Sequence, residues 1–218
     1  METQKISQTL LKRLPIYLNY LRSLPESTIT ISATAIARAL NLGDVQVRKD
    51  LAKISDGGRR RTGHFKEQLI RDLEEFLNFA NTTGSIVVGA GKLGQALLDY
   101  TGFEESGMNI LAGFDIHPPK IQDDSRKPVF PMQRLETFCQ CYDVRIGIIT
   151  VPADKAQEVC DRLVACGIRA IWNFAPVHLR VPAHVVIQNE NLAISLSTLR
   201  MQLMAMTARE AARQDRRA

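Results

Sequence analysis

Residues 85–94 read Ser-Ile-Val-Val-Gly-Ala-Gly-Lys-Leu-Gly, so a G-x-G-x-x-G turn directly follows a short β-branched run. In such a turn Gly89 bends the chain off the strand, Gly91 lets the backbone approach a pyrophosphate, and Gly94 lets the next helix pack on the sheet. That helix offers free N–H groups to the phosphates. A second apolar run ends in Asp115, where a carboxylate can accept a hydrogen bond from a ribose hydroxyl. The pattern predicts a dinucleotide site in a Rossmann domain.

Strand-like and helix-like stretches alternate along the rest of the chain, which predicts a doubly wound parallel sheet. Strands are expected at residues 110–114, 144–151, 170–174 and 185–188, and helices at residues 95–100 and 154–165. In this architecture ligands lie beyond the carboxyl ends of the strands. The cofactor contacts expected from these patterns are Gly89, Ala90, Gly91, Lys92, Leu93, Gly94, Asp115, Ile116, His117, Thr150, Val151, Pro152, Asn173, Phe174 and Ala175.

The carboxylate of Asp115 favours NAD, as NADH or NAD⁺, because it binds a ribose 2′-hydroxyl and repels a 2′-phosphate. His117 and Lys120 nearby leave NADP(H) open as an alternative. Hydride transfer would require a substrate and a general acid or base beside the nicotinamide. His117 follows Asp115 at the ribose end, and His178 and His184 have no evident catalytic partner. We therefore predict no catalytic residue and no enzyme, with an NAD(P)-dependent oxidoreductase as a remote alternative.

The segment that precedes the glycine turn is basic, and the rest of the chain is not. Residues 1–66 contain twelve Lys or Arg against five Asp or Glu, a balance of +7. Residues 67–218 contain sixteen against eighteen, a balance of −2. Such asymmetry suggests a polyanionic partner for the basic part, although a solvated face has the same composition.

The basic segment is typical of a helix-turn-helix domain. Apolar spacing predicts helices over residues 10–24, 33–40 and 44–54 and a short strand over residues 28–31. Pro15 can begin a new first turn, and Ser32 and Asp44 can cap the second and third helices. The Asn-Leu-Gly turn between these two helices is short enough for the DNA-binding form of the motif.

The third of these helices has a polar, basic face. Gln46, Lys49, Asp50 and Lys53 are expected to project from it, opposite an apolar stripe. A recognition helix presents such a face to the major groove, where Gln can read adenine and Lys can reach guanine or phosphate.

The loop over residues 55–63, Ser-Asp-Gly-Gly-Arg-Arg-Arg-Thr-Gly, is interpreted as the wing of a winged helix. Its arginines can contact phosphate or the minor groove. The alternative is a helix-turn-helix for protein contacts with solvated arginines. A connecting helix is expected over residues 65–79. The predicted DNA contacts are Arg13, Ser32, Gln46, Arg48, Lys49, Lys53, Arg59, Arg60 and Arg61.

The last stretch of the chain carries Ile, Leu and Met on a helix that is too apolar to remain in water. It suits a dimer contact, with packing on its own domain as the alternative. The expected fold is therefore α/β, with an N-terminal winged helix-turn-helix, a Rossmann doubly wound parallel sheet and a C-terminal dimerisation helix. The expected domains are residues 1–82, 83–191 and 192–218.

Five segments together resemble one protein family, the redox-sensing transcriptional repressor Rex. They are residues 11–17, 47–51, 89–94, 173–176 and 190–192, in the same order and across nearly the whole chain. The resemblance implies a bacterial homodimer with winged helices, Rossmann domains and exchanged last helices. It also implies that double-stranded, palindromic DNA operators are bound when NADH is scarce and released when NADH rises relative to NAD⁺.

The chain departs from the family at two places near the wing. Lys53-Ile54 stands where the family has aromatic residues after the recognition helix, and Gly63-His64 stands where the family has Gly-Tyr. We therefore expect a different operator preference.

The resemblance also implies residues that link the cofactor to the DNA domain. The family uses an Arg on the first helix, a Tyr after the glycine turn and an Asp at the start of the exchanged segment. Arg13 and Tyr100 match the first two positions, and Ala193 stands at the third. Ile194 occupies the place of the apolar residue that faces the nicotinamide. The alternative function is a Rex-like DNA-binding regulator whose cofactor response is lost or altered.

Other site types have little support in the sequence. The four cysteines do not form a disulfide framework or a zinc pattern, so we predict no metal, while a thiol switch at Cys139 and Cys141 stays open. No apolar run is long enough for a membrane span, and no signal-peptide core stands at the N-terminus. We therefore expect a cytoplasmic protein.

Overall fold

The computed structural model describes residues 7–55, 63–77, 83–119 and 127–215. The chain divides into two compact units, Met1–Thr82 and Thr83–Ala218. The predicted wing residues Arg59, Arg60 and Arg61 lie outside the described residues, as does Lys120.

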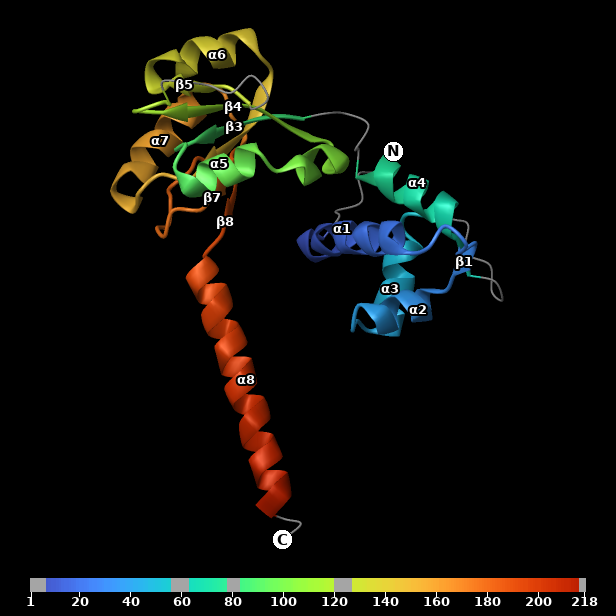
Figure 1. The fold of residues 1–218 in the computed structure, drawn as a ribbon. Coiled ribbons are helices and arrows are strands. Elements are labelled where there is room, and N and C mark those ends of the chain that lie inside the picture. The colour runs from blue at the N-terminus through green and yellow to red at the C-terminus, as the bar shows by residue number, and fades with distance from the viewer. Residues whose placement is uncertain (1–6, 56–62, 78–82, 120–126, 216–218) are drawn as a thin grey trace. The chain divides into compact units, whose positions relative to one another are not determined.

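The N-terminal unit consists of helices around one apolar core, with a short antiparallel sheet (Figure 1). Its core includes Leu14, Tyr17, Val47, Leu69 and Leu73, whose exposed fractions are all 0%. Its elements are α1 (Gln8–Ser23), β1 (Thr30–Ile31), α2 (Ala33–Ala39), α3 (Asp44–Leu51), β2 (His64–Phe65) and α4 (Lys66–Phe76).

The helix ends follow local capping and differ slightly from the expected bounds. Ser32 caps α2, because its Oγ accepts a hydrogen bond from the backbone N–H of Ala35 at 3.1 Å. Gly43, not Asp44, is the N-cap residue of α3, and Pro15 lies inside α1. After Leu51 the N–H groups of Lys53 and Ile54 bond to carbonyls three residues back, which tightens the chain into a turn at the end of α3.

A six-stranded parallel sheet forms the centre of the second unit. The strand order is β5-β4-β3-β6-β7-β8, so the chain winds outward in one direction from β3 and then in the other from β6. This is the Rossmann order, with its switch point between β3 and β6. The strands are β3 (Thr83–Val88), β4 (Met108–Asp115), β5 (Val129–Pro131), β6 (Val144–Ile149), β7 (Ala170–Asn173) and β8 (Val186–Asn189).

Helices cover both faces of this sheet (Figure 1). Successive residues of β3 point to opposite faces, so Ile86 and Val88 join one core and Val87 joins another. Helices α6 (Leu135–Cys141) and α7 (Ala153–Ala165) pack on the first core, and α5 (Lys92–Leu98) packs on the second. The predicted doubly wound sheet is confirmed.

The last helix, α8 (Leu192–Asp215), leaves its large apolar side chains from Leu192 to Met206 exposed. Ile194 is 63% exposed, Leu199 is 61% exposed and Met201 is 71% exposed. The alternative in which this helix packs on its own domain is wrong for the side chains from Leu192 to Met206. A single chain therefore leaves an apolar surface that a partner must cover.

Candidate cofactor and DNA-binding sites

The glycine turn after β3 has the geometry that its three glycines predict. Gly89 has a φ of +100°, in the left-handed region that only glycine adopts without strain. A Cβ on Gly94 would collide with the carbonyl oxygen of Gly89, so the turn and α5 can approach only without a side chain there. A Cβ on Gly91 would meet no heavy atom of the described residues within 4 Å, its chain neighbours apart. The space beside Gly91 is the space that a pyrophosphate requires.

Asp115, at the carboxyl end of β4, faces this turn. Its Oδ2 accepts a hydrogen bond from the backbone N–H of Ala90 at 2.6 Å, and its Oδ1 accepts one from the N–H of His117 at 2.8 Å. A carboxylate offers about four lone pairs, so two backbone bonds leave capacity for a ribose hydroxyl. Ile116 is 72% exposed and His117 is exposed, and both follow on the same edge.

The end of β6 is tied to the same turn. The hydroxyl of Thr150 donates to the carbonyl of Gly89 at 2.6 Å, and its N–H donates to the carbonyl of Val88 at 2.9 Å. Val151 and Pro152 come next and are partly buried and exposed, respectively. Gly89, Asp115 and Thr150 therefore come together at the switch point of the sheet.

Asn173, at the end of β7, has a different place from the one expected. Its exposed fraction is 0%. Its Nδ2 donates to the carbonyl of Val177 at 2.9 Å and to Oδ1 of Asn189 at 2.9 Å, and its Oδ1 accepts from the N–H of Ala175 at 3.0 Å. The amide therefore holds the loop that carries Phe174 and Ala175, and it does not line a crevice.

A cleft of about 370 Å³ lies where this loop and β8 meet the start of α8. It contains two of the predicted cofactor residues, Ala175 and Ile194, together with the carboxylate of Glu190. Glu190 accepts a hydrogen bond from the indole N–H of Trp172 at 3.2 Å. The lining residues are Ala175, Pro176, Val177, His178, Asn189, Glu190, Asn191, Ile194 and Ser195.

The solvent-facing side of α3, together with the turn that follows it, carries most of the predicted DNA contacts that the structure describes. Gln46, Lys49 and Lys53 follow one another at helical spacing and are exposed. The Arg48 side chain is 63% exposed and its Nη2 lies 2.8 Å from Oδ2 of Asp44. Ser32 is exposed at the start of α2. These side chains give α3 a basic, donor-rich surface, which suits a major groove.

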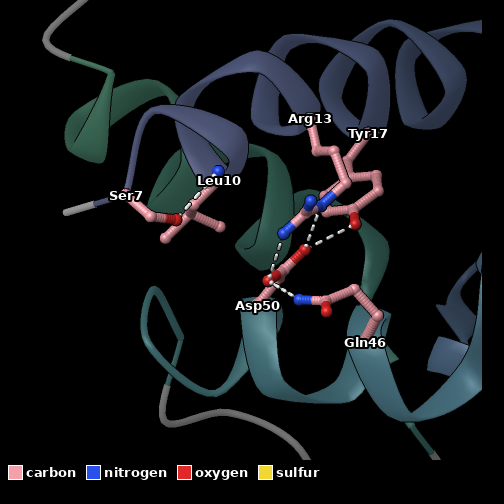
Figure 2. A network of polar contacts seen from close by, with 6 residues as sticks. All are labelled: Ser7, Leu10, Arg13, Tyr17, Gln46 and Asp50. Carbon is pink, nitrogen blue, oxygen red and sulfur yellow. Dashed lines mark hydrogen bonds and ion pairs between the residues drawn. The ribbon is translucent and has the colours of Figure 1, made fainter.

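Asp50 was expected on that exposed face, and this expectation was wrong. Asp50 is 2% exposed, and its carboxylate forms a bidentate ion pair with Arg13 of α1, with Nε–Oδ2 at 2.7 Å and Nη2–Oδ1 at 3.0 Å (Figure 2). Tyr17 and Gln46 donate to the same carboxylate at 2.8 Å and 2.7 Å. The sequence reading of α3 assumed that polar residues face water, and a polar partner on another helix overrides that rule.

The same ion pair gives Arg13 a partner within its own domain. This residue was predicted to contact DNA and to belong to the switch linkage, and two of its nitrogens are bound to the carboxylate of Asp50. Its side chain is 16% exposed. In this structure Arg13 joins α1 to α3.

Within the described part of the chain, the two other linkage positions have no such partner network. Tyr100 is 57% exposed, and its ring meets that of Phe103 edge-on with centroids 4.9 Å apart. Ala193 is the second residue of α8 and is exposed. Neither residue carries a charge that could replace a carboxylate at the start of α8.

The four cysteines are free thiols in the structure. Cys139 contacts Cys166 by a hydrogen bond between the side chains, and burial together with this neighbour raises the pKa of Cys139 to about 12. Cys141, the other cysteine of the thiol switch that the sequence left open, is exposed. A thiol with such a pKa stays protonated and reacts slowly.

Two site types are absent from the described ranges. The residues that the structure describes contain no group of three or more His, Cys, Asp or Glu that could hold a metal ion. No helix among them has the length and hydropathy of a membrane span.

Comparisons with known proteins agree with both halves of this description. A family model described as a CoA binding domain matches residues 80–177, and one described as the N-terminus of a putative DNA-binding protein matches residues 5–52. The redox-sensing transcriptional repressor Rex of Thermoanaerobacter pseudethanolicus is 37% identical over 204 residues, which are 91% of this chain and 90% of that protein. The protein of the same name from Bacteroides fragilis is 36% identical over 200 residues, 91% of each chain.

Solved structures give the same result. The crystal structure of RSP in complex with beta-NAD⁺ and operator DNA has a TM-score of 0.84 and 34% identity, and the match covers 97% of this chain and 98% of that chain. The structure of RSP in complex with beta-NADH has a TM-score of 0.83 and 34% identity, with coverages of 96% and 99%. A further structure of RSP is described as that of a Rex-family repressor.

Proposed function

This chain belongs to the Rex family of redox-sensing transcriptional repressors, and from this membership we propose that it represses transcription by binding operator DNA and releases that DNA on binding NADH. The observation that carries the proposal is that the likeness covers 97% of the chain, so one relative matches both the helix-turn-helix and the nucleotide domain. Members of this family are repressors and not enzymes. The protein acts in the cytoplasm under this proposal.

The nucleotide is held at the switch point of the sheet. The turn from Gly89 to Gly94 receives the pyrophosphate in the open space beside Gly91, and Asp115 accepts the adenosine ribose hydroxyl. The carboxylate disfavours a 2′-phosphate, which favours NAD(H) over NADP(H). The nicotinamide lies toward the cleft that contains Ala175 and Ile194.

The DNA is held by the N-terminal unit, with α3 as the recognition helix. Gln46, Lys49 and Lys53 reach bases and phosphates in the major groove, and Arg48 and Ser32 add contacts beside them. Arg59, Arg60 and Arg61 supply wing cations. The boundary between this unit and the nucleotide domain lies near residue 82, where the two compact units divide.

A homodimer accounts for the apolar surface of α8. The exposed Leu and Met side chains on this helix need a cover, and a second copy of the chain offers an identical apolar helix. A dimer also presents two recognition helices to the two half-sites of a palindrome. NADH and DNA are linked through the arrangement of the dimer. NADH can release DNA only to the extent that it binds more tightly to a dimer arrangement to which DNA binds less tightly.

The test is a titration of NADH, NAD⁺ and NADPH, each alone, into a complex of the full-length protein with a fluorescent palindromic duplex selected by the protein. Release by NADH and by neither of the others supports the proposal. A complex that persists at every NADH concentration identifies a DNA-binding regulator without a cofactor response. Failure to bind any duplex at low salt rejects the DNA-binding function.

A further inference from the structure

The carboxylate of Asp50, on the predicted recognition helix, accepts four hydrogen bonds from three side chains. Figure 2 shows Arg13 and Tyr17 reaching down from α1 and Gln46 reaching across from the previous turn of α3. Oδ1 accepts from Nη2 of Arg13 at 3.0 Å and from Nε2 of Gln46 at 2.7 Å. Oδ2 accepts from Nε of Arg13 at 2.7 Å and from the hydroxyl of Tyr17 at 2.8 Å. The acceptor capacity of one carboxylate is thereby filled.

The network determines which end of the Gln46 amide faces the protein. Burial acts to raise the pKa of Asp50, but the hydrogen bonds from Arg13, Tyr17 and Gln46 lower it below its usual value. An ionised carboxylate only accepts hydrogen bonds, so the amide group next to it must be the NH₂ and not the oxygen. The carbonyl oxygen and the second N–H of Gln46 are left for another partner.

That remaining pair of groups matches one base. In the major groove adenine presents an acceptor at N7 beside a donor at N6, and a glutamine amide satisfies both with one N–H and its carbonyl. Gln46 is exposed on the face of α3, two residues after its start, where a recognition helix contacts base edges. In the opposite orientation the carbonyl oxygen of Gln46 would face the Asp50 carboxylate, and the amide NH₂ would present two donors to the groove. The side chain would then have no hydrogen bond to Asp50 and could rotate.

A second Gln-Asp pair in the same unit shows what is special about the first. On α4, Nε2 of Gln68 donates to Oδ1 of Asp72 at 2.7 Å, with the same four-residue spacing and the same bond length. That pair is exposed, whereas Asp50 is buried and held by two side chains of α1. An exposed pair of this kind on one helix is weak, and a carboxylate anchored from another helix is not free to follow the glutamine.

We infer that Asp50 is a specificity-determining positioning residue, which holds the Gln46 amide with its carbonyl outward so that the recognition helix reads an adenine–thymine base pair. The ion pair with Arg13 also neutralises a carboxylate that would otherwise repel the phosphates from within α3. The inference rests on the proposed binding of DNA by α3. Beyond that proposal, it names the base pair that Gln46 reads and assigns a role in specificity to Asp50, which does not contact the DNA.

The experiment is a selection of bound duplexes from a pool of randomised double-stranded DNA, followed by sequencing. The full-length wild type is compared with Gln46→Ala, Asp50→Asn, the double variant, and the matched control Asp72→Asn. The readout is the preference at each base pair and not the general affinity, because Asp50→Asn and Asp72→Asn change the formal charge equally but at different distances from the DNA. Thermal unfolding of each variant reports folding separately.

We expect one base pair per half-site at which the wild type prefers A·T and Gln46→Ala loses that preference about fivefold or more. Asp50→Asn should reduce the preference at the same base pair at least about twofold, and add nothing in the Gln46→Ala background. Asp72→Asn should leave it unchanged. If Asp50→Asn does not fold, Tyr17→Phe, which removes one of the four donors, should weaken the same base preference.

Three results would overturn the inference. One is a folded Asp50→Asn, or Tyr17→Phe in its place, with the wild-type preference at the Gln46 base pair. Another is an equal effect of Asp50→Asn on the base preference in the wild-type and in the Gln46→Ala background, which would mean that Asp50 does not act through Gln46. The third is a preference at the Gln46 position for a base pair other than A·T. A wild type that enriches no sequence at all would instead reject the proposed function.

Discussion

Two aspartates, Asp50 in the N-terminal unit and Asp115 in the nucleotide unit, are bound in opposite ways. Asp115 accepts from backbone N–H groups, those of Ala90 and His117, and is only half-buried. Asp50 accepts only from side chains among the bonds described here, and it is buried. Every residue except proline has a backbone N–H donor, so a loop can bind a carboxylate and still leave room for a ligand. Side-chain donors must be supplied by particular residues, and they fill the carboxylate of Asp50 completely.

The largest effect is expected in the loop that Asp115 bonds, from Gly94→Ala. The new methyl group would collide with the carbonyl oxygen of Gly89, so the turn and α5 must separate. We expect a loss of about 3 kcal/mol or more of unfolding free energy, measured in urea. Gly91→Ala is the matched control, because its methyl group enters open space. It should keep wild-type stability and lose NADH affinity about tenfold or more. Equal stabilities of the two variants would contradict this account of the loop.

The second effect tests the side-chain network, with Arg13→Ala. Removal of the guanidinium leaves the carboxylate of Asp50 buried without its cation, and we expect a loss of about 3 kcal/mol of unfolding free energy. Arg22→Ala on the same helix is the control. Arg22 pairs with Glu74 at 2.8 Å with both side chains about one-third exposed, so it should cost less than about 1 kcal/mol.

The loss in Arg13→Ala should also depend on pH. The folded-state pKa of Asp50 lies below its unfolded value of 3.8, so its contribution to stability is fully present above about pH 4. It is lost as the pH falls through the folded-state pKa. The stability difference between wild type and Arg13→Ala should therefore be constant near neutral pH and shrink in acid. A difference that stays constant in acid would mean that Arg13 does not lower the pKa of Asp50 in the native protein.

The contrast between the two aspartates explains what could be predicted from the sequence. The glycine turn and Asp115 were predictable because a local pattern dictates backbone geometry, and the parallel, doubly wound sheet followed from alternating strands and helices. Asp50 was not predictable, because its partners Arg13 and Tyr17 lie 37 and 33 residues away on another helix. A hydrophobic period assigns a residue to a face, but it does not reveal a polar partner across the core.

The structure differs from the sequence-based expectations in two further respects, the short elements β5 and α6 and the place of Asn173. Strand β5 has three residues and α6 has seven, too few for a period to appear in the sequence. They are stabilised by tertiary contacts, such as the ring of Phe114 against Phe138 with centroids 5.3 Å apart. Asn173 sits at the end of a strand, where the topology favours ligand contacts, yet its amide is used to shape the next loop. Position at a strand end is therefore weaker evidence for a ligand than a spare acceptor is.

A smaller effect is expected when Asp115 itself is changed. Asp115→Asn keeps the shape of the side chain but removes the negative charge. This charge strengthens the hydrogen bond that the carboxylate accepts from the N–H of Ala90 at 2.6 Å and the one that it would accept from a ribose hydroxyl. We expect NADH affinity to fall about tenfold and the preference for NADH over NADPH to shrink, since the repulsion of a 2′-phosphate is gone. Calorimetric titration with both nucleotides measures the two numbers. An unchanged preference would show that Asp115 serves only the turn.

The smallest effect is expected from Tyr17→Phe. The ring of Tyr17 is fully buried and its hydroxyl donates to Asp50 at 2.8 Å. Burial, with the Asp50 carboxylate beside it, raises the pKa of Tyr17 to about 12, so the hydroxyl stays a neutral donor near neutral pH. Phenylalanine keeps the packing and removes one of four donors, for a loss of about 1 kcal/mol of unfolding free energy. Because Arg13 and Gln46 still hold the carboxylate, the loss should be well below that of Arg13→Ala. Equal losses of unfolding free energy in the two variants would mean that the four hydrogen bonds are fully cooperative, and that Asp50 has no dominant partner.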